Sequence, residues 1–209
     1  MIISKYLHSC LLVEENNKVV LIDPGVFSYQ EKVLVPKMLT ALDYILVTHN
    51  HFDHMSTPMI KDFVSKFPDV TIISNEEVVN ELVKEGLKAS TKGDENITII
   101  PLSHEKMFGG QKMSENSLFD IFGKLTHPGD SLSLDHTKDI LALPLDAPWG
   151  STTWALEVAL KLKPKIVIPI HDYLWKDAIR KMFSERIAEY LKEKNIDFKL
   201  LDTGQKIEV

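Results

Sequence analysis

The chain has 209 residues, of which 44% are hydrophobic and 26% charged, as in an ordinary globular protein with one sizeable core. The formal net charge is −6, and neither residues 1–150 (13 basic, 21 acidic) nor residues 151–209 (11 basic, 9 acidic) carry the basic excess typical of nucleic-acid binding. We therefore expect a single domain over residues 1–209 and no nucleic-acid partner.

The first part of the chain predicts short strands at residues 2–6, 10–13 and 19–22, because these segments are rich in β-branched residues and separated by turn-like pieces. Further strands are expected at residues 44–47, 70–73, 97–102, 140–143, 165–170 and 198–201, with a hairpin over residues 117–126. Helices are expected at residues 57–67, from the capping pattern at 74–77 to Gly86, and at 153–162. A long amphipathic helix follows, with one apolar face: Ala178, Ile179, Met182, Phe183, Ile187, Tyr190 and Leu191. This order predicts an α/β protein with mixed sheets and helices outside.

Cys10 is the only cysteine, which excludes an intrachain disulfide and a cysteine-based zinc knuckle. Residues 1–13 are apolar but are interrupted by Lys5, His8 and Ser9, unlike a signal peptide. No apolar run reaches membrane-spanning length. We expect a cytoplasmic protein with no membrane partner.

The densest group of metal-ligating residue types directly follows the apolar strand at 44–47. His49, His51, Asp53 and His54 lie within six residues, on a loop where side chains can converge. Imidazole and carboxylate are ligands that zinc, iron and manganese accept. The ordered pattern should arise by chance in on the order of one such chain in a thousand. The segment therefore predicts a metal site.

Further candidate ligands stand where other predicted strands end. His104 follows the strand at 97–102, His171 follows the strand at 165–170, and Asp130 follows Gly129 after the hairpin. An α/β sheet usually places its site at such strand ends. Together with the first cluster, these residues predict two adjacent metal positions.

The order of these motifs resembles the metallo-β-lactamase superfamily over nearly the whole chain. The pattern comprises Asp23 after an early strand, the Thr-His-x-His-x-Asp-His motif at 48–54, His104, the Gly-Asp step at 129–130, and His171. Residues 7–11 and 168–171 resemble one branch, the single-domain hydrolases similar to ascorbate-6-phosphate lactonase.

The resemblance implies a four-layer αββα sandwich and a ligand set. The first metal would be held by His49, His51 and His104, and the second by Asp53, His54 and His171, with Asp130 between them. It implies two divalent ions, zinc first, with manganese or iron as alternatives. Two such ions lower the pKa of a shared water, and Asp53 is the candidate catalytic residue that orients this water or moves its proton.

Four residues remain candidates for supporting or substrate-binding roles. Asp23 either fixes a ligand imidazole through a hydrogen bond or starts the turn at residues 24–25. His8 and His127 either contact substrate or are packed with their nitrogens satisfied. Trp149 either lines the pocket or covers the core. Residues 108–110 could form a mobile flap.

The leading functional hypothesis is a hydrolase of a small-molecule ester, lactone or phosphoester. One alternative is a mononuclear iron redox enzyme of the same fold. A small phosphodiesterase or nuclease is a second, and a binding protein that keeps its metals for stability is a third. The expected partner is a small-molecule substrate, and assembly into a homo-oligomer stays open.

Overall fold

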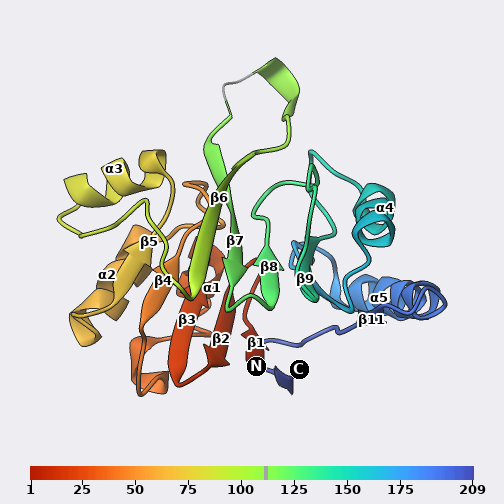
Figure 1. Cartoon of the computed structure of the whole chain (residues 1–209), viewed down its shortest axis with the longest axis horizontal. Helices are drawn as coiled ribbons and strands as arrows, with labels where there is room; N and C mark the ends of the chain where they lie inside the picture. The colour runs from red at the N-terminus through yellow and green to blue at the C-terminus, as the bar shows by residue number, and fades with distance from the viewer. Residues whose placement is uncertain (111–112) are drawn as a thin grey trace.

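The computed structural model describes residues 1–110 and 113–209 and contains two six-stranded sheets packed face to face (Figure 1). The first sheet has the order β12 (Lys206–Glu208), β1 (Ile2–Lys5), β2 (Leu11–Glu15), β3 (Lys18–Ile22), β4 (Tyr44–Leu46) and β5 (Thr71–Ile73). The second has the order β11 (Asp197–Phe198), β10 (Ile166–Ile170), β9 (Ile140–Pro144), β8 (Leu125–His127), β7 (Glu115–Ile121) and β6 (Ile97–Ser103).

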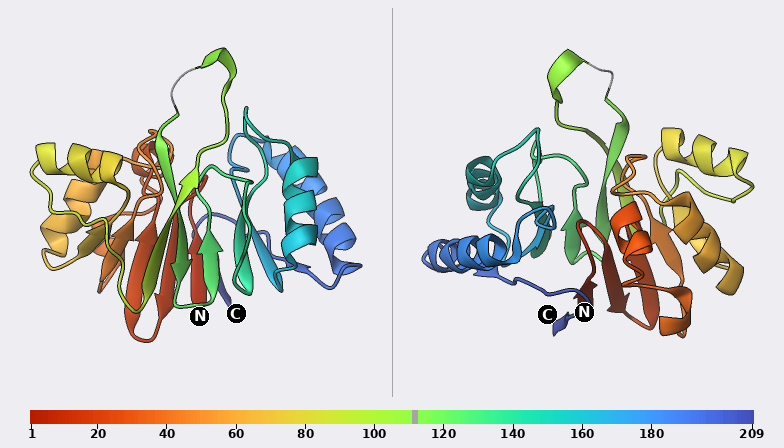
Figure 2. Two further views of the ribbon diagram at one scale, coloured as in Figure 1. Left: turned by 45° about the horizontal axis from the view of Figure 1, so that its top comes forward. Right: turned by 180° about the vertical axis from the view of Figure 1, so that it is seen from behind.

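Helices cover the outer face of each sheet (Figures 1 and 2). The α-helices are α1 (Val26–Gln30), α2 (Thr57–Lys66), α3 (Glu76–Lys84), α4 (Thr152–Leu162) and α5 (Asp177–Lys192), and two short 3₁₀ helices are η1 (Pro36–Met38) and η2 (Phe108–Gly110). Helices α2 and α3 lie outside the first sheet, whereas α4 and α5 lie outside the second. Among the helices that the structure describes, none is long and apolar enough to cross a bilayer.

Three apolar layers hold these four layers of secondary structure together. The central layer lies between the sheets and includes Ile3, Leu46 and Phe119, all fully buried or nearly so. A second layer joins the first sheet to α2 and α3 through side chains such as Phe63. A third joins the second sheet to α4 and α5 through side chains such as Leu191. The expected α/β class and αββα arrangement are confirmed.

Strand direction determines where loops collect. Strands β3, β4 and β5 run parallel in the first sheet, and β8, β9, β10 and β11 run parallel in the second. Parallel neighbours need crossover connections, most of which contain a helix here, and their carboxyl ends meet at one edge. The loops after β3, β4, β8 and β10 therefore gather at one end of the sandwich.

The C-terminal part of the chain departs from the sequence-based prediction in three ways. The strand expected at 198–201 is wrong in extent, because β11 covers only Asp197–Phe198. Strand β12 was not predicted; it pairs antiparallel with β1 and brings the two chain ends together. The apolar face expected for α5 is only partly correct, because Ile187 and Leu191 are buried while Met182 and Tyr190 are 40% and 43% exposed.

A buried ion pair connects the two sheets close to the gathered loops. Lys5, the last residue of β1, donates from its ammonium to Asp172, which follows β10. Arg180 of α5 donates from Nε to the other oxygen of Asp172 at 2.7 Å, and from Nη1 to Asp202 at 2.9 Å. Burial lowers the pKa of Lys5, whereas the Asp172 carboxylate opposes that shift. Lys5 therefore depends on Asp172 to remain charged inside the protein.

We expect the change Asp172→Asn to destabilise the fold strongly, because it leaves the Lys5 ammonium buried without a carboxylate. The free energy of unfolding in urea should fall by about 3 kcal/mol or more, the scale of a broken buried pair. The control is Asp202→Asn. The Asp202 side chain is 67% exposed and also pairs with Arg180. That change should cost less than about 1 kcal/mol. Equal losses in the two variants would contradict a structural role for the Lys5 pair.

Candidate metal centre

The loop at residues 48–54 is folded around the carboxylate of Asp23. Thr48 donates its backbone N–H to Asp23 Oδ1 at 2.8 Å and its hydroxyl to Oδ2 at 2.9 Å. His54 Nδ1 lies 2.7 Å from the same Oδ2 and donates its proton to it. Asp23 is fully buried with a φ of 47°. Of its two roles left open by the sequence, this geometry matches the one that orients an imidazole.

The backbone of this loop also packs directly against the loop after β3. Val26 donates its N–H to the carbonyl of Phe52 at 2.8 Å, and Ser56 donates to the carbonyl of Pro24 at 2.8 Å. A Cβ at Gly25 would lie 1.8 Å from the carbonyl oxygen of Asp53. Only glycine therefore permits this approach.

One group of candidate ligands consists of His49, His51, His104 and Asp130, whose ligand atoms all lie within 4.8 Å of one another. His49 donates from Nδ1 to the Thr48 hydroxyl at 3.0 Å, and His104 donates from Nδ1 to the carbonyl of Glu105 at 2.6 Å. These bonds leave Nε2 of each ring unprotonated. Both Nε2 atoms are buried and have no hydrogen-bond partner among the residues that the structure describes.

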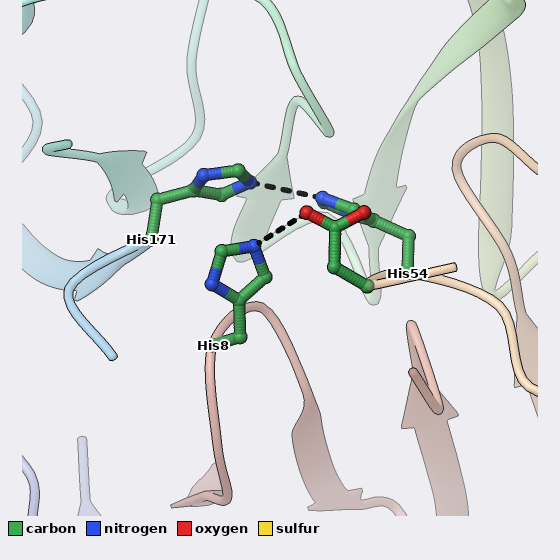
Figure 3. Close-up of side chains that lie close together, drawn as sticks. His8, His54 and His171 are labelled. Carbon is green, nitrogen blue, oxygen red and sulfur yellow. Dashed lines mark hydrogen bonds and ion pairs between the residues drawn. The ribbon is translucent and has the colours of Figure 1, made fainter. Parts of the chain in front are cut away.

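A second group consists of His8, Asp53, His54 and His171, within the same 4.8 Å limit. Nε2 of His54 lies 2.9 Å from Nε2 of His171, and His8 Nε2 lies 3.1 Å from Asp53 Oδ2 (Figure 3). The His8 and His171 rings are stacked with their centroids 3.9 Å apart. The structure thus brings His8 into the set that the sequence predicted for the second metal.

The carboxylate of Asp130 stands between the two groups. Its Oδ1 lies 2.7 Å from His171 Nε2 and 2.9 Å from His54 Nε2. Its Oδ2 lies 3.4 Å from His104 Nε2 and 3.8 Å from His49 Nε2. Each carboxylate oxygen therefore faces one group of histidines.

Asp130 is placed by a turn at Gly129 that has no room for a side chain. Gly129 has a φ of 60°, and a Cβ there would lie 2.1 Å from Asn116 Oδ1. Asn116 accepts the Asp130 backbone N–H at 3.2 Å and donates to the carbonyl of Pro128 at 3.0 Å. No sequence signal pointed to Asn116, because an asparagine near the start of a strand is common and its role depends on the fold.

Charge in the centre is strongly coupled. Burial lowers the pKa of His49 far below its usual value, and the neighbouring His54 adds to that shift. Burial also opposes charge on His54, yet the Asp130 and Asp23 carboxylates raise its pKa well above the usual value. Burial opposes ionisation of Asp130, but His171 and His54 hold its pKa well below the usual range. The site therefore keeps Asp130 ionised and favours positive charge next to that carboxylate.

The donor set fits divalent cations. Nε2 of His54 and Nε2 of His171 lie so close that they cannot both carry a proton. Asp130 Oδ1 makes no hydrogen bond to the described residues, although these two nitrogens are near it. Buried polar atoms are normally hydrogen-bonded, so unpartnered atoms converging on one space indicate a ligand. Histidine and carboxylate together suit zinc, manganese or iron.

The remaining sequence-predicted residues differ in their surroundings. His127 is fully buried, donates from Nε2 to the carbonyl of Ser9 at 3.2 Å and accepts the Gly129 N–H at 3.3 Å. This matches the packed alternative, and burial lowers its pKa. Trp149, in contrast, donates from its indole Nε1 to Asp130 Oδ2 at 3.0 Å. Its ring centroid is 5.7 Å from that of His171.

We expect Trp149→Phe to weaken metal binding, because it keeps an aromatic ring but removes the indole N–H that donates to Asp130. The affinity of the more weakly held metal should fall about tenfold, the scale of a lost supporting hydrogen bond, measured by competition with a chelator. Trp154→Phe in α4 is the matched control and should bind metal like the parent protein. Unchanged affinity in Trp149→Phe would show that the indole does not orient Asp130.

Comparison with known proteins identifies the family of the chain. The model of the beta-lactamase superfamily domain matches residues 2–171. A metal-dependent hydrolase of the UPF0173 group from Carboxydothermus hydrogenoformans is 28% identical over 194 residues, covering 80% of this chain and 83% of that protein.

Two solved structures share the fold. Igni18, a metallo hydrolase from Ignicoccus hospitalis, aligns with a TM-score of 0.72 at 16% identity, over 100% of this chain and 98% of that one. CmlA, a diiron β-hydroxylase from Streptomyces venezuelae, aligns with a TM-score of 0.70 at 12% identity, over 100% of this chain and 54% of that one. The family match shows that this chain belongs to the beta-lactamase superfamily, and the structure adds two convergent histidine and aspartate groups that could hold metal ions.

Proposed function

We propose that the centre holds two divalent metal ions, zinc in the first place, and hydrolyses a small-molecule ester, lactone or phosphoester. The observation that carries this proposal is the Asp130 carboxylate, because one oxygen faces each group of histidines. His49, His51 and His104 would hold one ion, Asp53, His54 and His171 the other, and Asp130 both. When bound, such a pair lowers the pKa of water and polarises the substrate oxygen.

The side chains assign the remaining tasks. The side chain of Asp53 is 20% exposed, so a water molecule can reach it. We assign this carboxylate to orienting the attacking water and accepting its proton. His8 donates to Asp53 Oδ2 and so fixes the direction of that carboxylate. Asp23 fixes His54 in the tautomer that leaves Nε2 free. The net charge of −6 supports a small-molecule substrate rather than a nucleic acid.

The same ligand types suit iron, and the CmlA fold shows that this scaffold also occurs in a diiron enzyme. An iron redox enzyme is therefore the competing function. It differs from the hydrolase in metal content, visible absorbance and oxygen uptake.

We expect elemental analysis of the purified protein to give about two metal equivalents, as in two-metal hydrolases, and Asp130→Ala to give one or none. Hydrolysis of chromogenic esters and phosphodiesters should fall at least about a hundredfold in the variant, as when a group that stabilises developing charge is lost. Asp135→Ala is the control, because Asp135 is 96% exposed in its side chain and should leave metal and activity intact.

Each other result has a definite meaning. One tightly held iron, with oxygen uptake in the presence of a thiol, would replace the hydrolase with the redox enzyme. Protein that stays free of metal after reconstitution would contradict the metal centre itself.

A further inference from the structure

Three of the exposed large apolar side chains lie in loops that carry candidate ligands, while others lie on α5 and other helices. Phe52 is 62% exposed and stands inside the 48–54 motif. Phe108, 80% exposed, lies in the loop that follows His104, and Leu174, 64% exposed, lies in the loop that follows His171. Single exposed apolar residues are common, so what matters is which of them is connected to the centre by packing contacts.

Aromatic rings connect this surface to the second ligand group. The Phe27 ring lies 5.7 Å from Phe52 and 4.8 Å from Tyr173, centroid to centroid. It also lies 5.4 Å from His8, which is stacked on His171. We name Phe27, Phe52 and Tyr173 the aromatic rim. The rim therefore extends without interruption from the candidate ligands to solvent.

The two pockets beside the centre offer no unpaired lysine or arginine among the described residues that line them. A pocket of about 130 Å³ next to His8 is lined by Lys5 and Arg180, but both cations are ion-paired with Asp172. A larger cavity of about 980 Å³ reaches His104 from between α3 and the β6–β7 hairpin. Among its described lining residues the carboxylates are Glu76 and Glu115, and none is lysine or arginine. Apart from the two ions that the centre would hold, a phosphoester would meet no unpaired cation among the described residues that line these two pockets.

We propose that the aromatic rim binds an apolar acyl or aryl group, so that the substrate is an uncharged ester or lactone bearing such a group and not a phosphoester. This inference rests on the proposed hydrolase function. Apolar groups gain from contact with rings in proportion to the surface they bury. Phe52 is the member of the rim that we expect to contact the apolar end of the substrate, because it is the most exposed of the three rings and packs against Phe27.

The test uses the metal-loaded protein and p-nitrophenyl esters from acetate to octanoate, beside p-nitrophenyl phosphate and bis(p-nitrophenyl) phosphate. The value of kcat/KM should rise up to roughly fourfold for each methylene that contacts the rim. Both phosphate compounds should react at least a hundredfold more slowly than the octanoate. In Phe52→Ala the rise of kcat/KM with acyl chain length should flatten, and the loss should appear in KM.

Phe52 is suited to truncation because an exposed side chain contributes little to the core. The matched control is Met38→Ala in η1, where the side chain is 54% exposed and outside the rim. It should retain the full dependence on chain length.

Binding without turnover gives an independent measurement. Calorimetry with straight-chain hydroxamates should show the octanoyl compound binding more tightly than the acetyl compound, and Phe52→Ala should remove most of that difference. This series tests the rim even if none of the chromogenic compounds is hydrolysed, an outcome that would count against the proposed function alone.

Three results would overturn the inference while leaving a hydrolase in place. They are preference for a phosphate compound, a rate independent of acyl length, and equal hydroxamate affinities. If Phe52→Ala instead dissociated an oligomer in sedimentation experiments and left the chain-length dependence unchanged, the rim would be an interface between copies of this chain.

Discussion

The centre depends on the hydrogen bonds that the buried carboxylate of Asp23 accepts from Thr48 and His54. This carboxylate is fully buried, a position that is costly for an unpaired charge, yet three donors satisfy it: the Thr48 N–H, the Thr48 hydroxyl and His54 Nδ1. The same Thr48 oxygen accepts from His49 Nδ1 at 3.0 Å. One carboxylate therefore sets the tautomer of a histidine in each ligand group.

The centre also carries backbone strain that the rest of the fold must hold in place. His8, Asp23 and His171 have φ values of 60°, 47° and 59°, a region that non-glycine residues rarely adopt. Each costs about 1–2 kcal/mol, so such residues persist only where their surroundings determine them. For His171 the constraint is local, because the next residue, Asp172, is held by Lys5 and Arg180. The ion pair between the sheets thus also fixes a candidate ligand.

The two sheets contribute unequal parts of the site. The first sheet supplies the loops with His8, Asp23 and the 48–54 motif, and the second supplies His104, Asp130 and His171. Each of the two ligand groups therefore takes residues from both sheets. The apolar layer between the sheets, with residues such as Leu46 and Ile170, therefore determines the distances within the centre as well as the stability of the fold.

The sequence by itself determined the fold class and the residue types of the centre. Strand and helix periods are local properties, and the spacing of His49, His51, Asp53 and His54 on one loop is independent of the remainder of the chain. It did not reveal β12, which has three residues and is stabilised by pairing with β1. It also misjudged α5, because periodicity shows that a face is apolar but not how much of that face the sheet covers.

Only the tertiary structure decided the roles of residues that act across the sandwich. His8 and His127 looked equivalent in the sequence, yet His8 faces Asp53 while both nitrogens of His127 are engaged by backbone groups. The contact of Trp149 with Asp130, and that of Phe27 with Tyr173, join segments far apart in the chain. Such contacts depend on how two sheets are packed, and that packing is a sum of many weak apolar contacts with no local signature.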